Sequence, residues 1–282
     1  MTEKLKKACV IGDPIAHSLS PAIHGHWIAE HSLDAAYERG HVTAEDFPDF
    51  ITRLRDHGYH GANVTVPHKE MAYRLVDRLH ETAKGVGAVN TLWFEDDTLV
   101  GANSDVAGFL GNLDEGQPGW DDGLQVATVI GAGGASRAVV KALHNRRIPT
   151  IRIANRTEER ARQLLDDLQI EAEIISWEKI QDAIAGAELI VNTTSLGMAG
   201  HTALDLDLSG ADSNALVTDI VYTPLKTPLL ETAERTGRPT VDGLGMLLHQ
   251  AVLGFERWFG ATPKVTPELR AAILNALQKK AA

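Results

Sequence analysis

The sequence predicts an α/β protein built from mostly parallel β-sheets and divided into two domains. Short runs of apolar and β-branched residues alternate with amphipathic helical patterns along the whole chain, which is typical of parallel sheets covered by helices. The 282 residues are about twice the length of a typical domain. A glycine-rich segment, Gly131–Ser136, follows an apolar run and precedes a helical pattern, which indicates a nucleotide-binding unit in the second half.

The first half of the chain contains three strand patterns, each followed by a helical pattern. We expect strands at Ala8–Ile11, Ala36–Glu38 and Ala62–Val66, with helices that begin near Pro21, Ala44 and His68. Pro21 and Pro67 both stand at helix starts, where a missing backbone N–H costs little. This order predicts β-α units.

A hairpin pattern follows these units. The strand patterns Ala88–Phe94 and Thr98–Ala102 flank Asp96 and Asp97, two residues that favour a tight turn. The hairpin would close the first unit, so we expect a domain boundary near residue 105.

The second half of the chain contains five strand patterns with helical patterns between them. They are Val126–Ile130, Ile151–Ala154, Glu173–Ile175, Leu189–Val191 and Leu216–Asp219. From Leu244 to Phe259 apolar residues recur at spacings of three and four, which predicts one long amphipathic helix. Gly260 and Pro263 would end it.

The composition is that of an ordinary globular protein, with 44% apolar and 23% charged residues. The formal net charge of -11 argues against a surface for nucleic acid or anionic membranes, because such surfaces need clustered Lys and Arg. The same charge repels anions in general. A phosphate or carboxylate ligand must therefore be held by local donors.

The sequence favours a reducing compartment, because Cys9 is the only cysteine and excludes both an internal disulfide and a multi-cysteine zinc site. The apolar stretch after Lys7 ends at Asp13, too short for a signal peptide, and no apolar run could span a bilayer. We therefore expect a cytoplasmic protein. We expect no metal site, because His24 and His26 face different sides of a helix and no other set of metal ligands is apparent.

The segment Val126–Ser136 predicts a dinucleotide-binding turn, because an apolar strand leads through a glycine-rich turn into a helix at Arg137–Asn145. Gly131 permits a tight turn, and Gly133 lets the backbone approach a pyrophosphate at the helix N-terminus. Ser136 replaces the third glycine at little cost in space. The alternative is a glycine-rich turn that binds no ligand.

The cofactor preference is indicated by the residues after the next strand. An NAD enzyme usually carries an acidic residue there, whereas this chain has Asn155, Arg156 and Thr157 after Ala154. Arg156 is placed to stack on adenine and meet a 2′-phosphate, and Arg160 can reach the same group. The sequence therefore favours NADP over NAD. The alternative is that Asn155 and Thr157 only cap a helix whose surface carries Arg160.

Further motifs resemble one enzyme family. In order they are Ser18-Leu-Ser-Pro21, Asn63-Val-Thr-Val-Pro-His-Lys69, Gly87-Ala-Val-Asn-Thr91, Asn103-Ser-Asp105, Asn192-Thr-Thr-Ser195, Tyr222 and Gly243-Leu-Gly-Met-Leu-Leu-His-Gln250. With the glycine-rich turn and Asn155–Thr157, they resemble the shikimate dehydrogenase family from residue 8 to about residue 255. The resemblance implies the reversible, NADPH-dependent reduction of 3-dehydroshikimate to shikimate, a step of aromatic amino acid biosynthesis.

The resemblance also implies the domain arrangement. An N-terminal α/β substrate-binding domain would comprise residues 1–105 and 243–282, and a Rossmann-type doubly wound NADP-binding domain would comprise residues 106–242. A cleft between the domains would hold both ligands. This agrees with the polar residues near the carboxyl ends of the first strands, where open α/β sheets bind ligands.

Lys69 and Asp105 resemble the catalytic pair of the family. Hydride that arrives at the C3 carbonyl leaves negative charge on oxygen; a positioned ammonium can stabilise this charge and supply a proton, while a carboxylate orients the ammonium. The pair would titrate as a unit, so the transferred proton is assigned to neither member. Without the resemblance, Lys69 fits a solvated surface lysine and Asp105 fits the cap of a helix that opens at Val106.

The resemblance assigns substrate contacts to further polar residues. Ser18 and Ser20 would bind the substrate carboxylate with Tyr222 as a third hydroxyl donor, although Ser20 before Pro21 is also a natural helix N-cap. The partners of the ring hydroxyls would be Thr65, Asn90, Asp105 and Gln250, with Lys69 also in contact with substrate. Asn63 is expected to brace the loop.

The resemblance implies cofactor contacts along the second unit. They come from Gly131, Ala132, Gly133, Gly134 and Ala135, from Asn155, Arg156, Thr157 and Arg160, and from Thr193, Ser195, Ile220, Gly243 and Met246. Leu247 also resembles an apolar neighbour of the nicotinamide, but its helical spacing fits a core position better.

Two alternative functions stay open. One is a quinate/shikimate dehydrogenase with relaxed substrate or cofactor choice, since acceptance of quinate depends on fine geometry. The other is a non-catalytic NADP-binding regulatory module on the same scaffold. Lys69, Asp105 and Gln250 favour the enzyme. We expect a small-molecule substrate, no nucleic-acid or membrane partner, and a monomer or homodimer.

Overall fold

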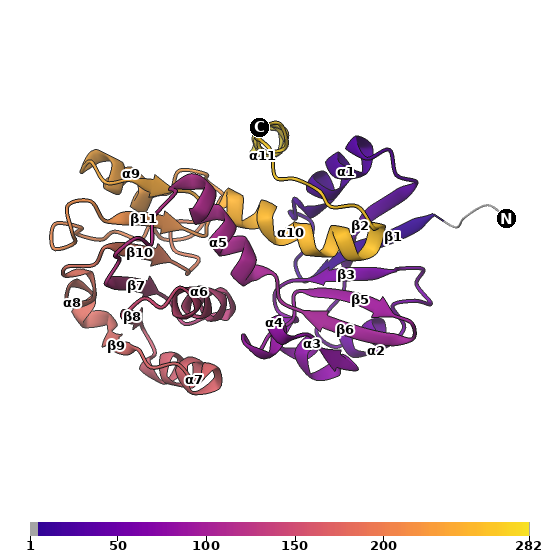
Figure 1. The fold of residues 1–282 in the computed structure, drawn as a ribbon, viewed down its shortest axis with the longest axis horizontal. Helices are drawn as coiled ribbons and strands as arrows, with labels where there is room; N and C mark the ends of the chain where they lie inside the picture. Colours follow the sequence, from indigo (N-terminus) through magenta and orange to yellow (C-terminus); the bar gives the residue numbers. More distant parts are fainter. Residues whose placement is uncertain (1–4, 282) are drawn as a thin grey trace. The chain divides into compact units, whose positions relative to one another are not determined.

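The computed structural model describes residues 5–281 and consists of two compact α/β units (Figure 1). The first unit comprises Met1–Ser104 with Leu248–Ala282, and the second comprises Asp105–Leu247. The chain passes from one unit to the other after Ser104 and again within helix α10 (Leu244–Phe259). The first unit is therefore discontinuous in sequence, and the second is continuous.

The first unit contains a six-stranded mixed sheet in the order β2-β1-β3-β5-β6-β4. The strands are β1 (Lys6–Gly12), β2 (Ala35–His41), β3 (Gly61–Val64), β4 (Arg78–Leu79), β5 (Thr91–Glu95) and β6 (Thr98–Ala102). The helices of this unit are α1 (Ser20–Glu30), α2 (Phe47–Thr52), α3 (Lys69–Leu75), α4 (Glu81–Lys84) and α11 (Pro267–Ala281), besides most of α10. β1 pairs in parallel with β2 and β3, whereas β5 is antiparallel to both of its neighbours.

Two apolar layers cover this sheet. One layer contains Cys9, Ile11 and Leu92 from strands together with Phe47 and Ile51 of α2. The other is aromatic and joins α1 to the last turns of α10.

In the aromatic layer, the ring of His24 stacks on Tyr37 with centroids 3.9 Å apart, and Trp27 packs edge-on against Phe255 at 5.4 Å. The indole of Trp258 donates to the carbonyl of Leu92 at 2.7 Å. The residues after 247 therefore complete the core of the first unit.

The second unit contains a six-stranded parallel sheet in the order β12-β11-β10-β7-β8-β9. The strands are β7 (Val126–Ile130), β8 (Thr150–Asn155), β9 (Glu173–Ser176), β10 (Leu189–Asn192), β11 (Leu216–Asp219) and β12 (Thr240–Val241). The helices are α5 (Asp105–Gly116), α6 (Gly134–Asn145), α7 (Glu158–Leu168), the 3-10 helix η1 (Trp177–Lys179), α8 (Ile180–Ile184) and α9 (Pro228–Arg235). The strand order reverses between β7 and β10, as in a doubly wound fold, and such sheets bind ligands at the carboxyl ends next to the reversal.

The predicted α/β fold class is confirmed, and several elements have the predicted bounds. They are the strands Thr98–Ala102, Val126–Ile130 and Leu216–Asp219 and the helix Leu244–Phe259. The α10 helix ends at Phe259, and the next residue, Gly260, has a φ of 73°, which suits a glycine.

Other predicted bounds were wrong for local reasons. The strand predicted at Ala62–Val66 ends at Val64, because a turn closes at once when the N–H of His68 donates to the carbonyl of Thr65 at 2.9 Å. The helix predicted near Ala44 begins at Phe47 instead. The hydroxyl of Thr43 accepts from the N–H of Asp46 at 3.2 Å, which holds a turn before the helix.

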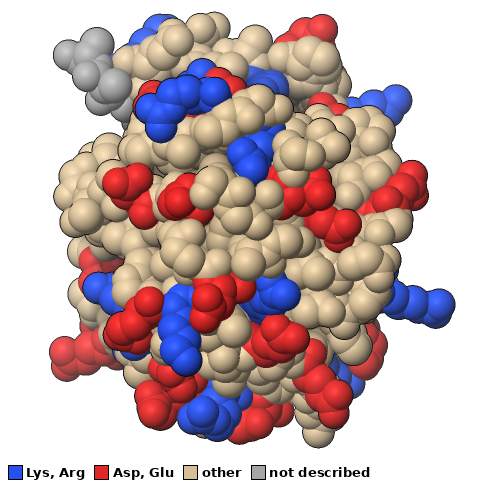
Figure 2. Space-filling view, turned by 90° about the vertical axis from the view of Figure 1, so that its left-hand side faces the viewer, with Lys and Arg blue, Asp and Glu red and all other residues tan. Residues whose placement is uncertain are grey.

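No helix within residues 5–281 combines the length and the apolar character needed to cross a membrane. On the face drawn in Figure 2, acidic and basic side chains lie side by side, and no large area carries only Lys and Arg.

Candidate active site

The glycine-rich turn joins β7 to α6 in the second unit. Gly131 has a φ of 112°, a backbone conformation that favours glycine, and its N–H donates to the carbonyl of Ala154 at 2.8 Å. A Cβ atom on Gly131 would collide with the side chains of Thr193 and Thr194. Gly133 and Gly134 are exposed, with open space where a Cβ atom would stand. The N-terminus of α6 is therefore open to an anionic group such as a pyrophosphate.

Ser136 has a larger role in this turn than its small size suggests. Its buried hydroxyl accepts from the N–H of Gly133 at 3.0 Å and lies 2.6 Å from the hydroxyl of Thr193. Thr193 in turn donates to the carbonyl of Ile130 at 2.7 Å. The end of β10 thus fixes the shape of the turn after β7.

The residues at and just after the end of β8 include two exposed arginines and the N-cap residue of α7. Thr157 occupies the N-cap position of α7, but its side chain makes no capping hydrogen bond; Asn155 donates to the carbonyl of Thr157 at 2.7 Å. The predicted capping role is therefore wrong for the Thr157 hydroxyl. Arg156 and Arg160 are exposed, and no carboxylate among the described residues pairs with either. Two uncompensated positive charges at this position fit a phosphate group.

A buried carboxylate organises the ends of β10 and β11. Asp219 accepts from the side chains of Asn192 at 2.9 Å and Thr227 at 2.7 Å, and from the N–H of Val221 at 2.9 Å. Burial raises the pKa of Asp219, and these three donors oppose that shift. The bonds fix the loops that carry Thr193, Ser195 and Ile220, three of the predicted cofactor residues.

Tyr222, Gly243 and Met246 lie on the following segments of the same unit. Burial raises the pKa of the Tyr222 phenol, which keeps it protonated and able to donate a hydrogen bond. A Cβ atom on Gly243 would collide with the carbonyl of Ile220, so the backbone there needs glycine. Met246 is buried in the apolar core of the second unit, whereas Leu247 is only half-buried. The expectation of a core position for Leu247 was therefore wrong.

On the first unit, the structure brings the side chains of Ser18 and Ser20 together. Leu19 is the N-cap of α1 and Ser20 is its first residue, so the N-cap prediction for Ser20 was wrong. The two hydroxyl oxygens lie 3.3 Å apart, and the hydroxyl of Ser18 accepts from the N–H of Ser20. Arg39 donates twice to the carbonyl of Ser18, from Nη2 at 2.7 Å and Nε at 3.2 Å.

The side chain of Asn63 links strand β2 to the segment that contains Asn90, which fits the expected structural role. Its side-chain oxygen accepts from the hydroxyl of Tyr37 at 2.6 Å, and its amide donates to the carbonyl of Asn90 at 3.2 Å. Burial raises the pKa of Tyr37 far above its usual range, so this phenol stays protonated. Thr65 follows at the end of β3 and is half-buried.

Asn90 links two segments that carry the predicted catalytic residues. Its buried side-chain oxygen accepts from the N–H of Ser104 at 2.9 Å, and Ser104 directly precedes Asp105. The neighbouring N–H of Val89 donates to the carbonyl of Lys69 at 3.0 Å. The side-chain amide of Asn90 also donates to the oxygen of Gln250 at 3.5 Å.

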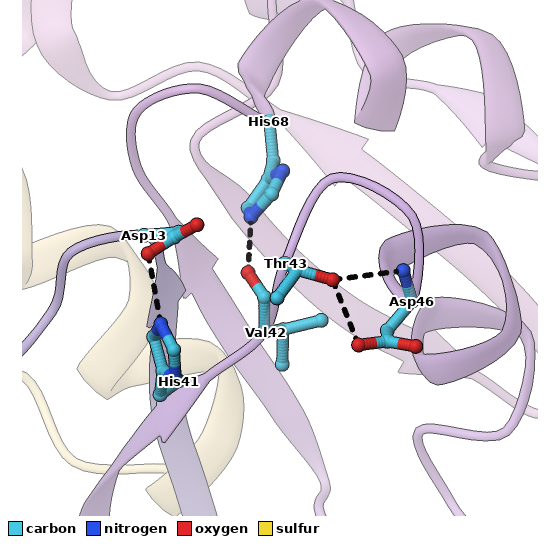
Figure 3. A network of polar contacts seen from close by, with 6 residues as sticks. All are labelled: Asp13, His41, Val42, Thr43, Asp46 and His68. Carbon is cyan, nitrogen blue, oxygen red and sulfur yellow. Dashed lines mark hydrogen bonds and ion pairs between the residues drawn. The ribbon is translucent and has the colours of Figure 1, made fainter.

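Lys69 is the first residue of α3 and is half-buried, and the residue before it is firmly anchored. Figure 3 shows the ring of His68 directed at the carbonyl of Val42. Nε2 lies 2.7 Å from that oxygen, and the ring stacks on Phe47 with centroids 4.4 Å apart. Asp105 is buried and is the first residue of α5. The predicted cap before a helix at Val106 was therefore wrong, because the helix already includes Asp105.

Among residues 5–281, no group of three or more His, Cys, Asp or Glu side chains is arranged to hold a metal ion. Ser136, Tyr37 and Arg39 were not singled out as site residues from the sequence. Tyr37 and Arg39 act through residues distant in the chain, so no local motif contains the signal. Ser136 lies within the glycine-rich motif, but its contact with Thr193 joins residues that are far apart in the chain.

Three family models match the chain. They are described as shikimate dehydrogenase substrate binding domain at residues 10–92, shikimate / quinate 5-dehydrogenase at residues 122–207 and shikimate 5'-dehydrogenase C-terminal domain at residues 243–274. Shikimate dehydrogenase (NADP(+)) of Mesorhizobium japonicum is 51% identical over 280 residues, which cover 99% of this chain and 100% of that protein. The Brucella abortus enzyme of the same name is 50% identical and covers 98% of this chain and 96% of its own length.

Solved structures are similar over the whole chain. Shikimate 5-dehydrogenase from Thermus thermophilus, in complex with NADP(H) and shikimate, has a TM-score of 0.82 at 31% identity and covers 98% of this chain and 99% of its own. Quinate dehydrogenase from Corynebacterium glutamicum, in complex with NAD, has a TM-score of 0.89 at 30% identity and covers 96% of this chain and 99% of its own.

Proposed function

The chain belongs to the shikimate dehydrogenase family, and we propose that it reduces 3-dehydroshikimate reversibly to shikimate with NADPH. Support comes from relatives of that name at about half identity over nearly the full length, and from the doubly wound sheet of the second unit. The enzyme is an NADP-dependent oxidoreductase that acts on a CH–OH group, and the reaction is a step of aromatic amino acid biosynthesis.

The observation that carries this proposal is the hydrogen bond from the N–H of Ser104 to the side chain of Asn90. Ser104 directly precedes Asp105 in the chain. Asn90 directly follows Val89, whose N–H donates to the carbonyl of Lys69. These bonds within the first unit hold the backbone of Lys69 and of Ser104, the residue that directly precedes Asp105. This arrangement supports an ammonium and a carboxylate that act together.

Lys69 and Asp105 perform the acid-base chemistry in this proposal. NADPH supplies the hydride when it is bound. The Lys69 ammonium stabilises the negative charge that develops on the C3 oxygen, and the pair delivers the proton that completes the alcohol. Asp105 orients the ammonium, and in the reverse direction the pair accepts the proton from the hydroxyl.

The remaining polar residues of the first unit bind the substrate in this proposal. Ser18 and Ser20, whose hydroxyls lie 3.3 Å apart, donate to the carboxylate. Thr65, Asn90 and Gln250 meet the ring hydroxyls. Such groups discriminate strongly, because a substrate that lacks one hydroxyl leaves a donor or acceptor unpaired.

The second unit binds NADP in this proposal. The open N-terminus of α6, with Gly131, Ala132, Gly133, Gly134 and Ala135, receives the pyrophosphate. Arg156 and Arg160 meet the 2′-phosphate, with Asn155 and Thr157 beside them. Thr193, Ser195, Ile220, Gly243 and Met246 make the remaining cofactor contacts, with Met246 beside the nicotinamide.

The test is a comparison of two acids with two cofactors. Purified protein is mixed with shikimate or quinate and with NADP or NAD, and the absorbance of the reduced nicotinamide is followed. We expect shikimate with NADP to give the highest kcat/KM. Turnover of quinate with NAD at an equal or higher rate would favour a relaxed quinate/shikimate dehydrogenase, and no turnover with any pair, despite NADP binding, would favour a regulatory module. The Lys69→Ala variant is the control for contaminating activity.

We also propose a cytoplasmic location and a monomeric or dimeric state. The only cysteine, Cys9, is buried in the core of the first unit, which suits a reducing compartment. Light scattering coupled to gel filtration measures the oligomeric state directly.

A further inference from the structure

We propose that Arg39 supplies the positive charge that attracts and orients the substrate carboxylate at Ser18 and Ser20. The inference rests on the proposed function and deepens it. Arg39 lies outside the sequence motifs on which the resemblance to the family rests, and the serine hydroxyls alone provide no charge to balance an anion.

The guanidinium of Arg39 bonds to the backbone of Ser18, and the side chain of Ser18 forms one half of the proposed carboxylate site. Nη2 and Nε of Arg39 donate to the same carbonyl oxygen, that of Ser18, at 2.7 and 3.2 Å. The hydroxyl of Ser18 lies 3.3 Å from that of Ser20. Two donors on one acceptor fix the plane of the guanidinium, and its remaining N–H groups keep their capacity to donate.

The position of Arg39 on β2 explains why it meets this loop. Tyr37, Arg39 and His41 alternate along the strand and therefore point to the same face of the sheet. On one side of Arg39, Tyr37 donates to Asn63 at 2.6 Å; on the other, His41 lies 2.8 Å from the carboxylate of Asp13 (Figure 3). This face of β2 is thus bonded to the segments that follow β1 and to β3.

The charge of Arg39 is not neutralised by the described part of the chain. No carboxylate among residues 5–281 lies within ion-pair distance of Arg39, although other arginines of the same unit, such as Arg53 and Arg55, pair with aspartates. The Ser18 carbonyl accepts hydrogen bonds but carries no net charge. In a protein with a formal net charge of -11, an uncompensated cation beside two neutral hydroxyl donors is a local site for an anion.

A carboxylate suits this site better than other anions of similar charge. Its two oxygens match a pair of hydroxyl donors that lie close together, and a nearby guanidinium strengthens both bonds through its charge. Because Arg39 is exposed, water and salt screen the attraction, so its contribution is modest: we expect roughly a three- to tenfold effect on KM.

The experiment compares the acid with an ester. Shikimate and its methyl ester have the same ring and hydroxyls, but only the acid carries the negative charge. Oxidation of each with NADP is measured for the wild type, Arg39→Gln, Arg39→Lys and the control Arg53→Gln, which removes one charge from the surface of the same unit. Thermal unfolding confirms that each variant is folded.

We expect Arg39→Gln to raise KM for shikimate by about three- to tenfold and KM for the ester by less than about twofold, with kcat and KM for NADP nearly unchanged. Arg39→Lys keeps the charge and should lie close to the wild type. Added salt should raise KM for shikimate in the wild type and much less in Arg39→Gln. Arg53→Gln should behave as the wild type with both substrates.

Two results would overturn the inference while leaving the proposed function intact. An unchanged KM for shikimate in Arg39→Gln would show that the charge is unused. An equal rise for acid and ester would show that Arg39 only holds the Ser18 loop. A wild-type protein that does not oxidise shikimate would instead overturn the proposed function, and this inference with it.

Discussion

The hydroxyl oxygens of Ser136 and Thr193 lie 2.6 Å apart, and this contact joins the glycine-rich turn after β7 to the end of β10. The two strands are neighbours at the point where the strand order of the sheet reverses. The pair therefore fixes the glycine-rich turn at the carboxyl ends of β7 and β10, where doubly wound sheets bind dinucleotides.

Ser136→Ala should weaken NADP binding while leaving the fold intact. The N–H of Gly133 would lose its acceptor, and the turn would no longer be held in one shape; loss of one such bond costs about 1 kcal/mol, so we expect roughly a five- to tenfold higher Kd for NADPH. Fluorescence titration with NADPH measures this. Ser213→Ala, an exposed serine of the same unit, is the control, and a Kd equal to that of the wild type in Ser136→Ala would contradict the role of the contact.

Arg156→Glu should move the cofactor preference from NADP toward NAD. The new carboxylate repels a 2′-phosphate and accepts from ribose hydroxyls, so the ratio of kcat/KM for NADP to that for NAD should fall by at least about a hundredfold. Steady-state kinetics with both cofactors measure the ratio. Arg162→Glu makes the same charge change on the exposed surface of α7 and should have little effect. Equal discrimination in Arg156→Glu and the wild type would rule out this role of Arg156.

Lys69→Ala should lower kcat far more than it changes KM for shikimate. Loss of the ammonium removes a stabilising charge that matters most in the transition state, so kcat should fall by about 10²- to 10⁴-fold while KM changes by less than about threefold. The double variant with Asp105→Asn should be little worse than Lys69→Ala, because the two groups act as a unit. NADPH binding serves as the control for folding. A nearly normal kcat in Lys69→Ala would refute the assignment of the pair.

His24 should make the stability of the protein fall as the pH falls below neutrality. Burial lowers the pKa of His24 to about 3, whereas an unfolded histidine titrates near 6.5. Between these values the unfolded chain binds a proton that the folded protein does not, so stability present above about pH 6.5 is lost as the pH falls toward 3.

His24→Phe keeps an aromatic ring against Tyr37 and removes the titrating group. From about pH 6.5 to about pH 4.5, the wild type should lose roughly 2 kcal/mol more of its free energy of unfolding than the variant does. Urea unfolding followed by tryptophan fluorescence measures both curves. At about pH 8 the imidazole is neutral in both states, so the difference there reports packing alone. Curves that run parallel over the whole range would contradict the prediction.

The strands of the second unit were predictable because parallel strands buried on both faces are continuous apolar runs. Val126–Ile130 is such a run apart from Thr128, and its bounds agree with the structure. Leu216–Asp219 also has the predicted bounds and is buried throughout, although Thr218 and Asp219 are polar. By contrast, β4 and α4 have 2 and 4 residues, too few to show a period. They are held by distant bonds, such as that from the N–H of His80 to the carbonyl of Gly101 at 2.8 Å.

Candidate site residues could be proposed from the sequence where they stand together in short motifs. Ser18 with Ser20 is one such motif, and Arg156 with Arg160 is another. Arg39 lies 21 residues from Ser18, and only the pairing of β1 with β2 brings the two together. Because Arg39 meets Ser18 only when the two strands pair, the residues next to either one in the sequence do not indicate the contact.

The division of α10 between the two units sets an order in which the protein can be completed during its synthesis. The second unit is contiguous, so every residue of its sheet has left the ribosome once residue 247 has emerged. The first unit must wait for Phe255 and Trp258, which fill its aromatic layer. The part of the chain that is made first is thus finished last, and a nascent chain that stops before residue 248 carries an N-terminal half with an open apolar face.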